Sequence, residues 1–147
     1  MPVASIDESS GPSDGAIGGG DPVGLLPGGN PVPGGAPKIV IPRAGVQNPH
    51  PVPIAQLLVA VRGHDVAVQI EYWSGVEPCS VLARVDVKRA GDVFTVSPHE
   101  GATDTGKACI DIAQLKATIV DLGELAPGTY TVRAASGDAA DVRVTVS

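Results

Sequence analysis

From residue 37 onward, apolar and polar residues alternate with a period of two, which is the pattern of half-buried β-strands. The clearest run covers residues 65–73. Because successive side chains of a strand point to opposite faces, one face of this run is apolar. That face holds Val66, Val68, Ile70 and Tyr72. We therefore expect Tyr72 in the core and its neighbour Trp73 on the opposite side of the sheet.

Similar runs elsewhere predict about eight short strands separated by turn residues. The expected strands cover residues 38–41, 54–62, 65–73, 81–88, 93–97, 117–122, 129–133 and 142–146. In the fourth run the inward row is expected to be Val81, Ala83, Val85 and Val87. Residues 111–118 also fit one helical turn, but the β-branched residues that follow favour a strand. This spacing predicts an all-β sandwich.

Glycine and proline divide the chain into two parts. Residues 1–53 hold 11 of the 19 glycines and 11 of the 14 prolines. Such a segment buries too little apolar surface to offset the entropy lost on ordering. We predict a disordered tether over residues 1–36 and one β-sandwich domain over residues 37–147.

Charge and cysteine content narrow the function classes. The net charge is −6, so we expect no nucleic-acid partner. Two interpretations of the compartment are open: a cytosolic chain with an unusual N-terminal tail, or an exported chain whose signal lies upstream of residue 1. We favour export to the extracellular space or cell envelope, where a lipid anchor upstream of residue 1 would tether the chain to the membrane. Cys79 and Cys109 are the only cysteines, and an even number in an exported β domain favours one disulfide. Free core thiols and a metal site with the histidines are the alternatives, and we expect neither a metal nor a cofactor.

Pro127, Gly128 and Tyr130 form the second structural motif. Proline and glycine favour a chain reversal, and the tyrosine then opens a strand. A tyrosine there can bond back to the chain just upstream, as in the tyrosine corner of immunoglobulin-like sandwiches. An ordinary core tyrosine is the alternative, and both roles are structural.

Several segments carry a family resemblance. They are Glu77-Pro78-Cys79, Val85-Asp86-Val87, Val93-Phe94-Thr95-Val96, Cys109, and the closing run of residues 120–132, VDLGELAPGTYTV. Together they resemble a family of bacterial secreted, often lipoprotein-type, immunoglobulin-like domains. The resemblance covers about half of the chain and implies an immunoglobulin-like fold and an exported protein. It implies no activity and no catalytic residues.

Motifs that suggest chemistry are weak. Residues 101–107 fit G-x-x-x-x-G-K, but Ala108 lacks the hydroxyl that binds Mg²⁺ in phosphate-binding loops. We interpret this segment as a mobile polar loop. His99 and Glu100 could be a base with its orienting carboxylate, but we expect a solvated pair in that loop. We therefore predict that the chain is not an enzyme.

Trp73 is the candidate binding residue. It shares its strand face with polar residues, so it is half-exposed or covered by a neighbouring loop. We predict a non-catalytic binding module for a protein or glycan ligand. The alternative is a structural subunit that self-associates by strand exchange through Lys38-Ile39-Val40-Ile41.

Overall fold

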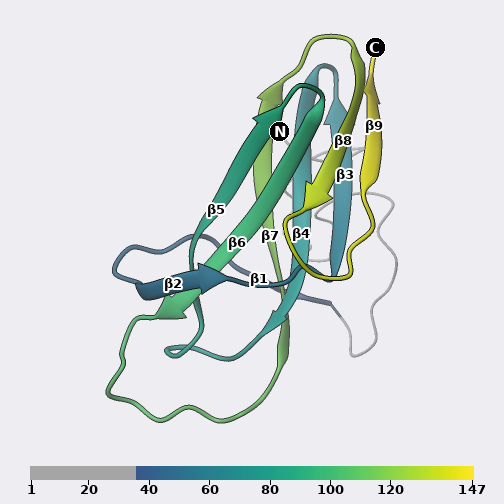
Figure 1. Ribbon diagram of the computed structural model, residues 1–147. Coiled ribbons are helices and arrows are strands. Elements are labelled where there is room, and N and C mark those ends of the chain that lie inside the picture. The colour runs from purple at the N-terminus through teal and green to yellow at the C-terminus, as the bar shows by residue number, and fades with distance from the viewer. Residues whose placement is uncertain (1–35) are drawn as a thin grey trace.

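The computed structural model describes residues 36–147, and the predicted tether lies outside this part except for its last residue (Figure 1). The described residues form nine strands and no helix. The strands are β1 (Lys38–Ile39), β2 (Gln47–Pro51), β3 (Gln56–Arg62), β4 (Asp65–Ser74), β5 (Val81–Ala90), β6 (Val93–Ala102), β7 (Gln114–Glu124), β8 (Gly128–Ala134) and β9 (Val142–Val146). The all-β prediction is confirmed. Within the described residues, no helix long and apolar enough for a membrane span is found.

The first sheet has four strands in the order β1-β7-β4-β3. β3 and β4 form an antiparallel hairpin whose turn contains Gly63 at φ 63°, a conformation that glycine adopts without strain. β4 also pairs antiparallel with β7, and its even-numbered residues point inward, as the alternation predicts. β1 adds a two-residue parallel ladder at the β7 edge.

The second sheet is organised around β6. β5 pairs antiparallel with β6 along one edge. The other edge of β6 is shared, because β8 pairs in parallel with residues 93–96 and β2 pairs antiparallel with residues 99–102. β9 completes the sheet beside β8. Two strands from distant parts of the chain thus lie end to end against β6.

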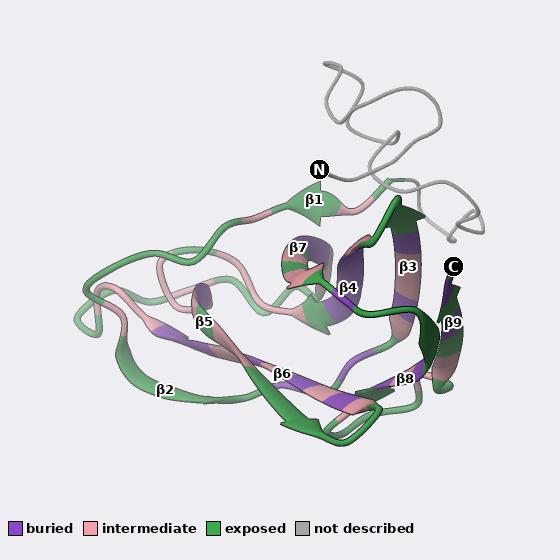
Figure 2. Ribbon diagram, turned by 90° about the horizontal axis from the view of Figure 1, so that it is seen from above, coloured by how far each residue is buried: buried purple, intermediate pink, exposed green. Residues whose placement is uncertain are grey.

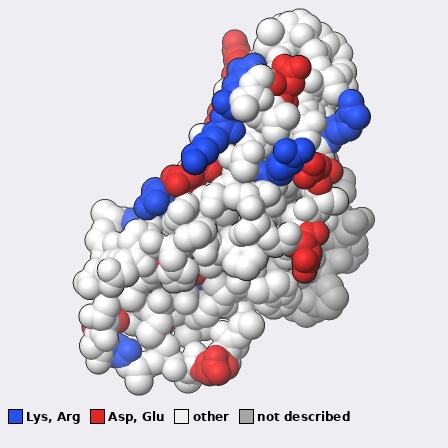
Figure 3. All heavy atoms as spheres, in the orientation of Figure 1, with Lys and Arg blue, Asp and Glu red and all other residues white. Residues whose placement is uncertain are grey.

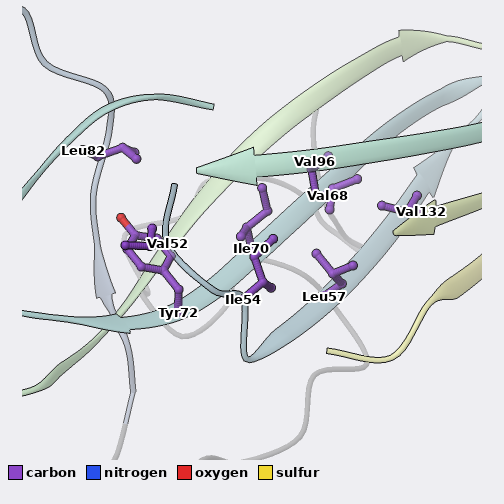
Figure 4. Close-up of a cluster of buried hydrophobic side chains, with 9 residues drawn as sticks. All are labelled: Val52, Ile54, Leu57, Val68, Ile70, Tyr72, Leu82, Val96 and Val132. Carbon is purple, nitrogen blue, oxygen red and sulfur yellow. The ribbon is translucent and has the colours of Figure 1, made fainter. Parts of the chain in front are cut away.

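The two sheets pack face to face as a β-sandwich, with the buried residues between the layers (Figure 2). The larger core cluster takes side chains from both sheets (Figure 4): Val52, Ile54, Leu57, Val68, Ile70, Tyr72, Leu82, Val96 and Val132. A second cluster surrounds Phe94 and Tyr130 at the β8–β9 end. Mostly aliphatic side chains therefore fill the core.

Three features of the strands differ from what the sequence predicts. β2 was not predicted; it contains Pro49 and Pro51, which a strand tolerates at a sheet edge. β6 extends to Ala102, so His99 and Glu100 lie in a strand and not in a solvated loop. Residues 111–118, for which the sequence favours a strand over a helical turn, contain no helix, and β7 begins within them at Gln114.

The third correction concerns the inward row of β5. The register of β5 against β6 shifts between Leu82 and Arg84. Because a bulge inserts one residue, Leu82 becomes fully buried beside Val81 while Ala83 is only partly buried. Val87, also expected inward, is 39% exposed at the edge.

Candidate functional site

The disulfide prediction is confirmed. Cys79 and Cys109 are bonded, with a Cα–Cα distance of 6.2 Å. The bond joins the loop after β4 to the loop after β6, so it ties together two connections at one end of the sandwich. Both cysteine sulfur atoms form this bond, which rules out free thiols and a metal site with cysteine ligands. The described residues also contain no group of His, Cys, Asp and Glu able to hold a metal.

The corner motif has the predicted geometry. The Tyr130 hydroxyl donates to the Ala126 carbonyl oxygen at 2.5 Å, four residues upstream. Its ring is buried, with the Phe94 ring centroid 6.1 Å away. Pro127 precedes β8 on the exposed surface, and Gly128 has φ 157°. These residues form a structural corner and offer no reactive group.

Trp73 lies on the outer face of the four-stranded sheet, where 49% of it is exposed. Its cross-strand partner is Leu115, and the same face of β7 continues through Ala117 and Ile119. Ile39 of β1 pairs with Ala117 from the other side. We call this surface the Trp73 face. Its residues are Ile39, Leu58, Gln69, Glu71, Trp73, Leu115, Ala117 and Ile119.

Two polar side chains occupy the middle of the Trp73 face. Gln69 and Glu71 are both 4% exposed, and Gln69 Nε2 donates to Glu71 Oε2 at 2.7 Å. Burial raises the pKa of Glu71, and the Gln69 hydrogen bond opposes this in part. Gln69 Oε1 and Glu71 Oε1 receive no hydrogen bond from the described residues. Because both oxygen atoms are buried, the accessible part of this face is its apolar rim of Ile39, Trp73 and Ile119.

A buried charged network lies between the sheets, and the sequence pattern does not predict it. Lys116 Nζ donates to Glu100 Oε2 at 3.0 Å and to the Ser80 carbonyl oxygen at 2.9 Å. The Tyr72 hydroxyl donates to the same Glu100 oxygen at 3.1 Å. Burial and the nearby Glu100 carboxylate raise the pKa of Tyr72 far above its ordinary value. The sequence does contain a sign of it: Glu100 lies four residues after the inward residue Val96 in β6, so the two side chains point to the same face.

The outer face of the five-stranded sheet carries a polar pocket beside His99. His99 Nε2 lies 3.1 Å from Asp86 Oδ2 and 3.4 Å from Ser97 Oγ. Arg84 donates to His99 Nδ1 at 3.4 Å. In a Ser-His-Asp triad, the serine and the aspartate contact different ring nitrogens. Here both approach Nε2, so the arrangement does not provide a general base oriented toward Ser97.

The remaining candidates lie apart. The segment that fits G-x-x-x-x-G-K leaves β6 at Ala102 and continues as a loop, with Lys107 exposed. No helix follows it in the described residues, so it lacks the helix N-terminus of a phosphate-binding loop. His50 is exposed in β2, and His64 Nε2 lies 2.9 Å from the carbonyl oxygen of Ser147. The structure does not bring the three histidines together.

No family model, curated protein or solved structure matches this chain. Two surfaces of the described domain can contact a ligand. One is the Trp73 face of the four-stranded sheet, which is apolar with a polar centre. The other is the pocket beside His99, which is polar and charged.

Proposed function

We propose that this chain is a non-catalytic, immunoglobulin-like binding module of the extracellular space or cell envelope, and that its Trp73 face contacts a protein partner. The Tyr130 corner and the two packed sheets support the immunoglobulin-like assignment. The disulfide departs from the antibody pattern, because it joins two loops and not two facing strands. A disulfide is compatible with an oxidising compartment.

The observation that carries the proposal is the exposed indole of Trp73 on a framework strand. Tryptophan is enriched among the residues that dominate protein interfaces, because it buries a large apolar area with few rotatable bonds. Ile39 and Ile119 on the same face are 37% and 39% exposed. Exposed apolar side chains spread over a sheet face suit a protein surface better than a small metabolite.

Affinity capture with matched variants tests this function. The chain, Trp73→Ser and Val87→Ser are immobilised and exposed to an extract of the cells that produce the protein. Val87 is the control because it is also a partly exposed apolar residue, on the other sheet. We expect a protein that the wild type and Val87→Ser retain and that Trp73→Ser loses. Equal retention by all three, or none by the wild type, contradicts the proposal.

The second candidate function is a structural subunit that polymerises by strand exchange. The observation that favours it is the short β1–β7 ladder, which joins only Lys38-Ile39 to Lys116-Ala117. Val40 adds one backbone bond to the Ala117 carbonyl, and Ile41 is 71% exposed. A segment held by so few bonds can be replaced by the same segment of a second copy.

Light scattering after size exclusion tests strand exchange. The strand-exchange function predicts dimers or longer assemblies at tens of micromolar protein, and Val40→Pro removes them because proline cannot donate the backbone bond to Ala117. The matched control is Val46→Pro. It changes a valine in the connection between β1 and β2, outside the segment of residues 38–41 that would be exchanged. A monomer at all concentrations contradicts this second function.

A further inference from the structure

The shared edge of β6 creates a pocket that the functions above do not use. β8 follows β6 to Val96, and β2 begins to pair at His99. Between these points the flanking chains diverge, with Ala135 N bonding to the Val96 carbonyl and Val52 N to the Pro98 carbonyl. A pocket of about 360 Å³ opens there on the outer face of the sheet. It arises from the topology, since two strands end against one side of a third.

The walls of the pocket are held in place. Pro51 lines one side and Ala135–Ser136 the other, above a floor of β6 side chains. The segment after Ser136 is fixed, because Gly137 bridges to Ile54 and a Cβ on Gly137 would lie 2.3 Å from the Ile54 carbonyl oxygen. Ile54 itself is buried in the core. The pocket is therefore preformed.

The polar groups of the lining divide into two sets. The first set already has partners within the protein: Asp86 pairs with His99 at 3.1 Å and with Arg84 Nε at 3.0 Å. The second set has no side-chain partner among residues 36–147 and is available to a ligand. It consists of the Lys88 ammonium and the hydroxyls of Thr95 and Ser136. Available hydroxyls beside an available ammonium suit a ligand with hydroxyl groups and one negative charge.

Local charge supports an anionic ligand, although the chain as a whole is acidic. Lys88 and Arg84 project from the outer face of β5, and Arg133 faces Thr95 from β8. Figure 3 shows Lys and Arg side chains along the β5 edge, interrupted by acidic ones. Arg84 forms an ion pair with Asp86, and Arg133 forms one with Asp141. Of these three cations, Lys88 is the one that keeps its charge available for a ligand.

We propose that this pocket binds a sugar acid, with the carboxylate on Lys88 and ring hydroxyls on Thr95 and Ser136. The volume accommodates one or two sugar rings. The lining has no Phe, Tyr or Trp side chain, so hydrogen bonds and charge, rather than stacking, select the ligand. The site lies on the opposite sheet from the Trp73 face and is independent of the function proposed for that face.

Titration of the ¹⁵N-labelled full chain with D-glucuronate, followed by NMR, tests the proposal. We expect saturable shifts that cluster at Lys88, Thr95, Ser97 and Ser136, with a dissociation constant of about 1 mM. D-glucose is the matched neutral sugar and should bind at least about tenfold more weakly, because it lacks the charge that pairs with Lys88.

Variants and simple anions complete the experiment. Lys88→Gln should weaken glucuronate binding at least about tenfold, and the matched control Arg143→Gln, which removes an exposed cation from β9, should not. Amide shift dispersion verifies that both variants are folded. Three results overturn the proposal: no shifts at the pocket, equal binding of glucose, or equal binding of acetate and inorganic phosphate. The last result would mean a site for simple anions only.

Discussion

Removing one partner of the buried Lys116–Glu100 pair should destabilise the domain more than removing both. Both side chains are 2% exposed and their charged atoms are 3.0 Å apart. Lys116→Met leaves the Glu100 carboxylate buried with only the Tyr72 hydroxyl as a donor, and leaves the Ser80 carbonyl without its ammonium. Breaking a buried pair in this way costs about 3–5 kcal/mol. A small domain has about 5–15 kcal/mol in total, so this is a large share.

The double variant Lys116→Met/Glu100→Leu separates the charge from the packing. It leaves no buried charge, and an apolar replacement of a buried ion pair is often close to neutral. We expect the free energy lost in the double variant to fall short of the sum of the two single losses by at least about 2 kcal/mol. Urea denaturation with the disulfide intact measures all four proteins. Losses that add within about 0.5 kcal/mol would refute the coupling.

Four further predictions concern stability. Reduction of the Cys79–Cys109 bond opens a loop with a sequence separation of 30 residues and should cost about 3.6 kcal/mol in thermal melts, while the native chain should have a mass about 2 Da below the reduced chain. Tyr130→Phe removes the corner hydrogen bond and should cost about 1–3 kcal/mol in the same melts; a loss below about 0.5 kcal/mol would contradict the corner. Burial raises the pKa of Glu71 above its ordinary value of 4.5. The folded state therefore favours the protonated side chain, and this contribution to the free energy of unfolding is complete below pH 4.5 and is lost as the pH rises through the raised pKa. Glu71→Gln should therefore be more stable than the wild type at pH 7, an advantage that disappears in acid; urea melts at both pH values test this, and a variant less stable at pH 7 would contradict it. Deleting residues 1–36 should change the free energy of unfolding by less than about 1 kcal/mol, and a larger loss would contradict the tether prediction.

Alternation predicts the direction of side chains correctly where a strand is regular and has one apolar face. It placed Tyr72 inward and Trp73 outward, because in β4 the period of two continues without a break from Val66. It failed in β5, where the bulge after Leu82 shifts the register. Bulges depend on how two strands pair, so a single run of residues does not reveal them.

The missed features depend on contacts between distant segments. Pro49 and Pro51 argue against a strand, and β2 exists because it occupies one edge position beside β6. Glu100 is expected in a solvated loop because the predicted strand ends at Ser97. Its partner Lys116 comes from the other sheet. The pocket beside His99 is likewise lined by β2, by the β5–β6 pair and by the two residues after β8, which lie far apart in the chain.

Site-specific photo-crosslinking in the cells that produce the protein tests the central claim most directly. A photoreactive amino acid replaces Ile119, at the exposed rim of the Trp73 face, and in a control it replaces Thr131, on the outer side of the other sheet. We predict an adduct with a different protein from position 119 and none from position 131, with the adduct lost when Trp73 is changed to serine. No adduct from position 119, or adducts of equal yield from both positions, would contradict a protein-binding role for this face.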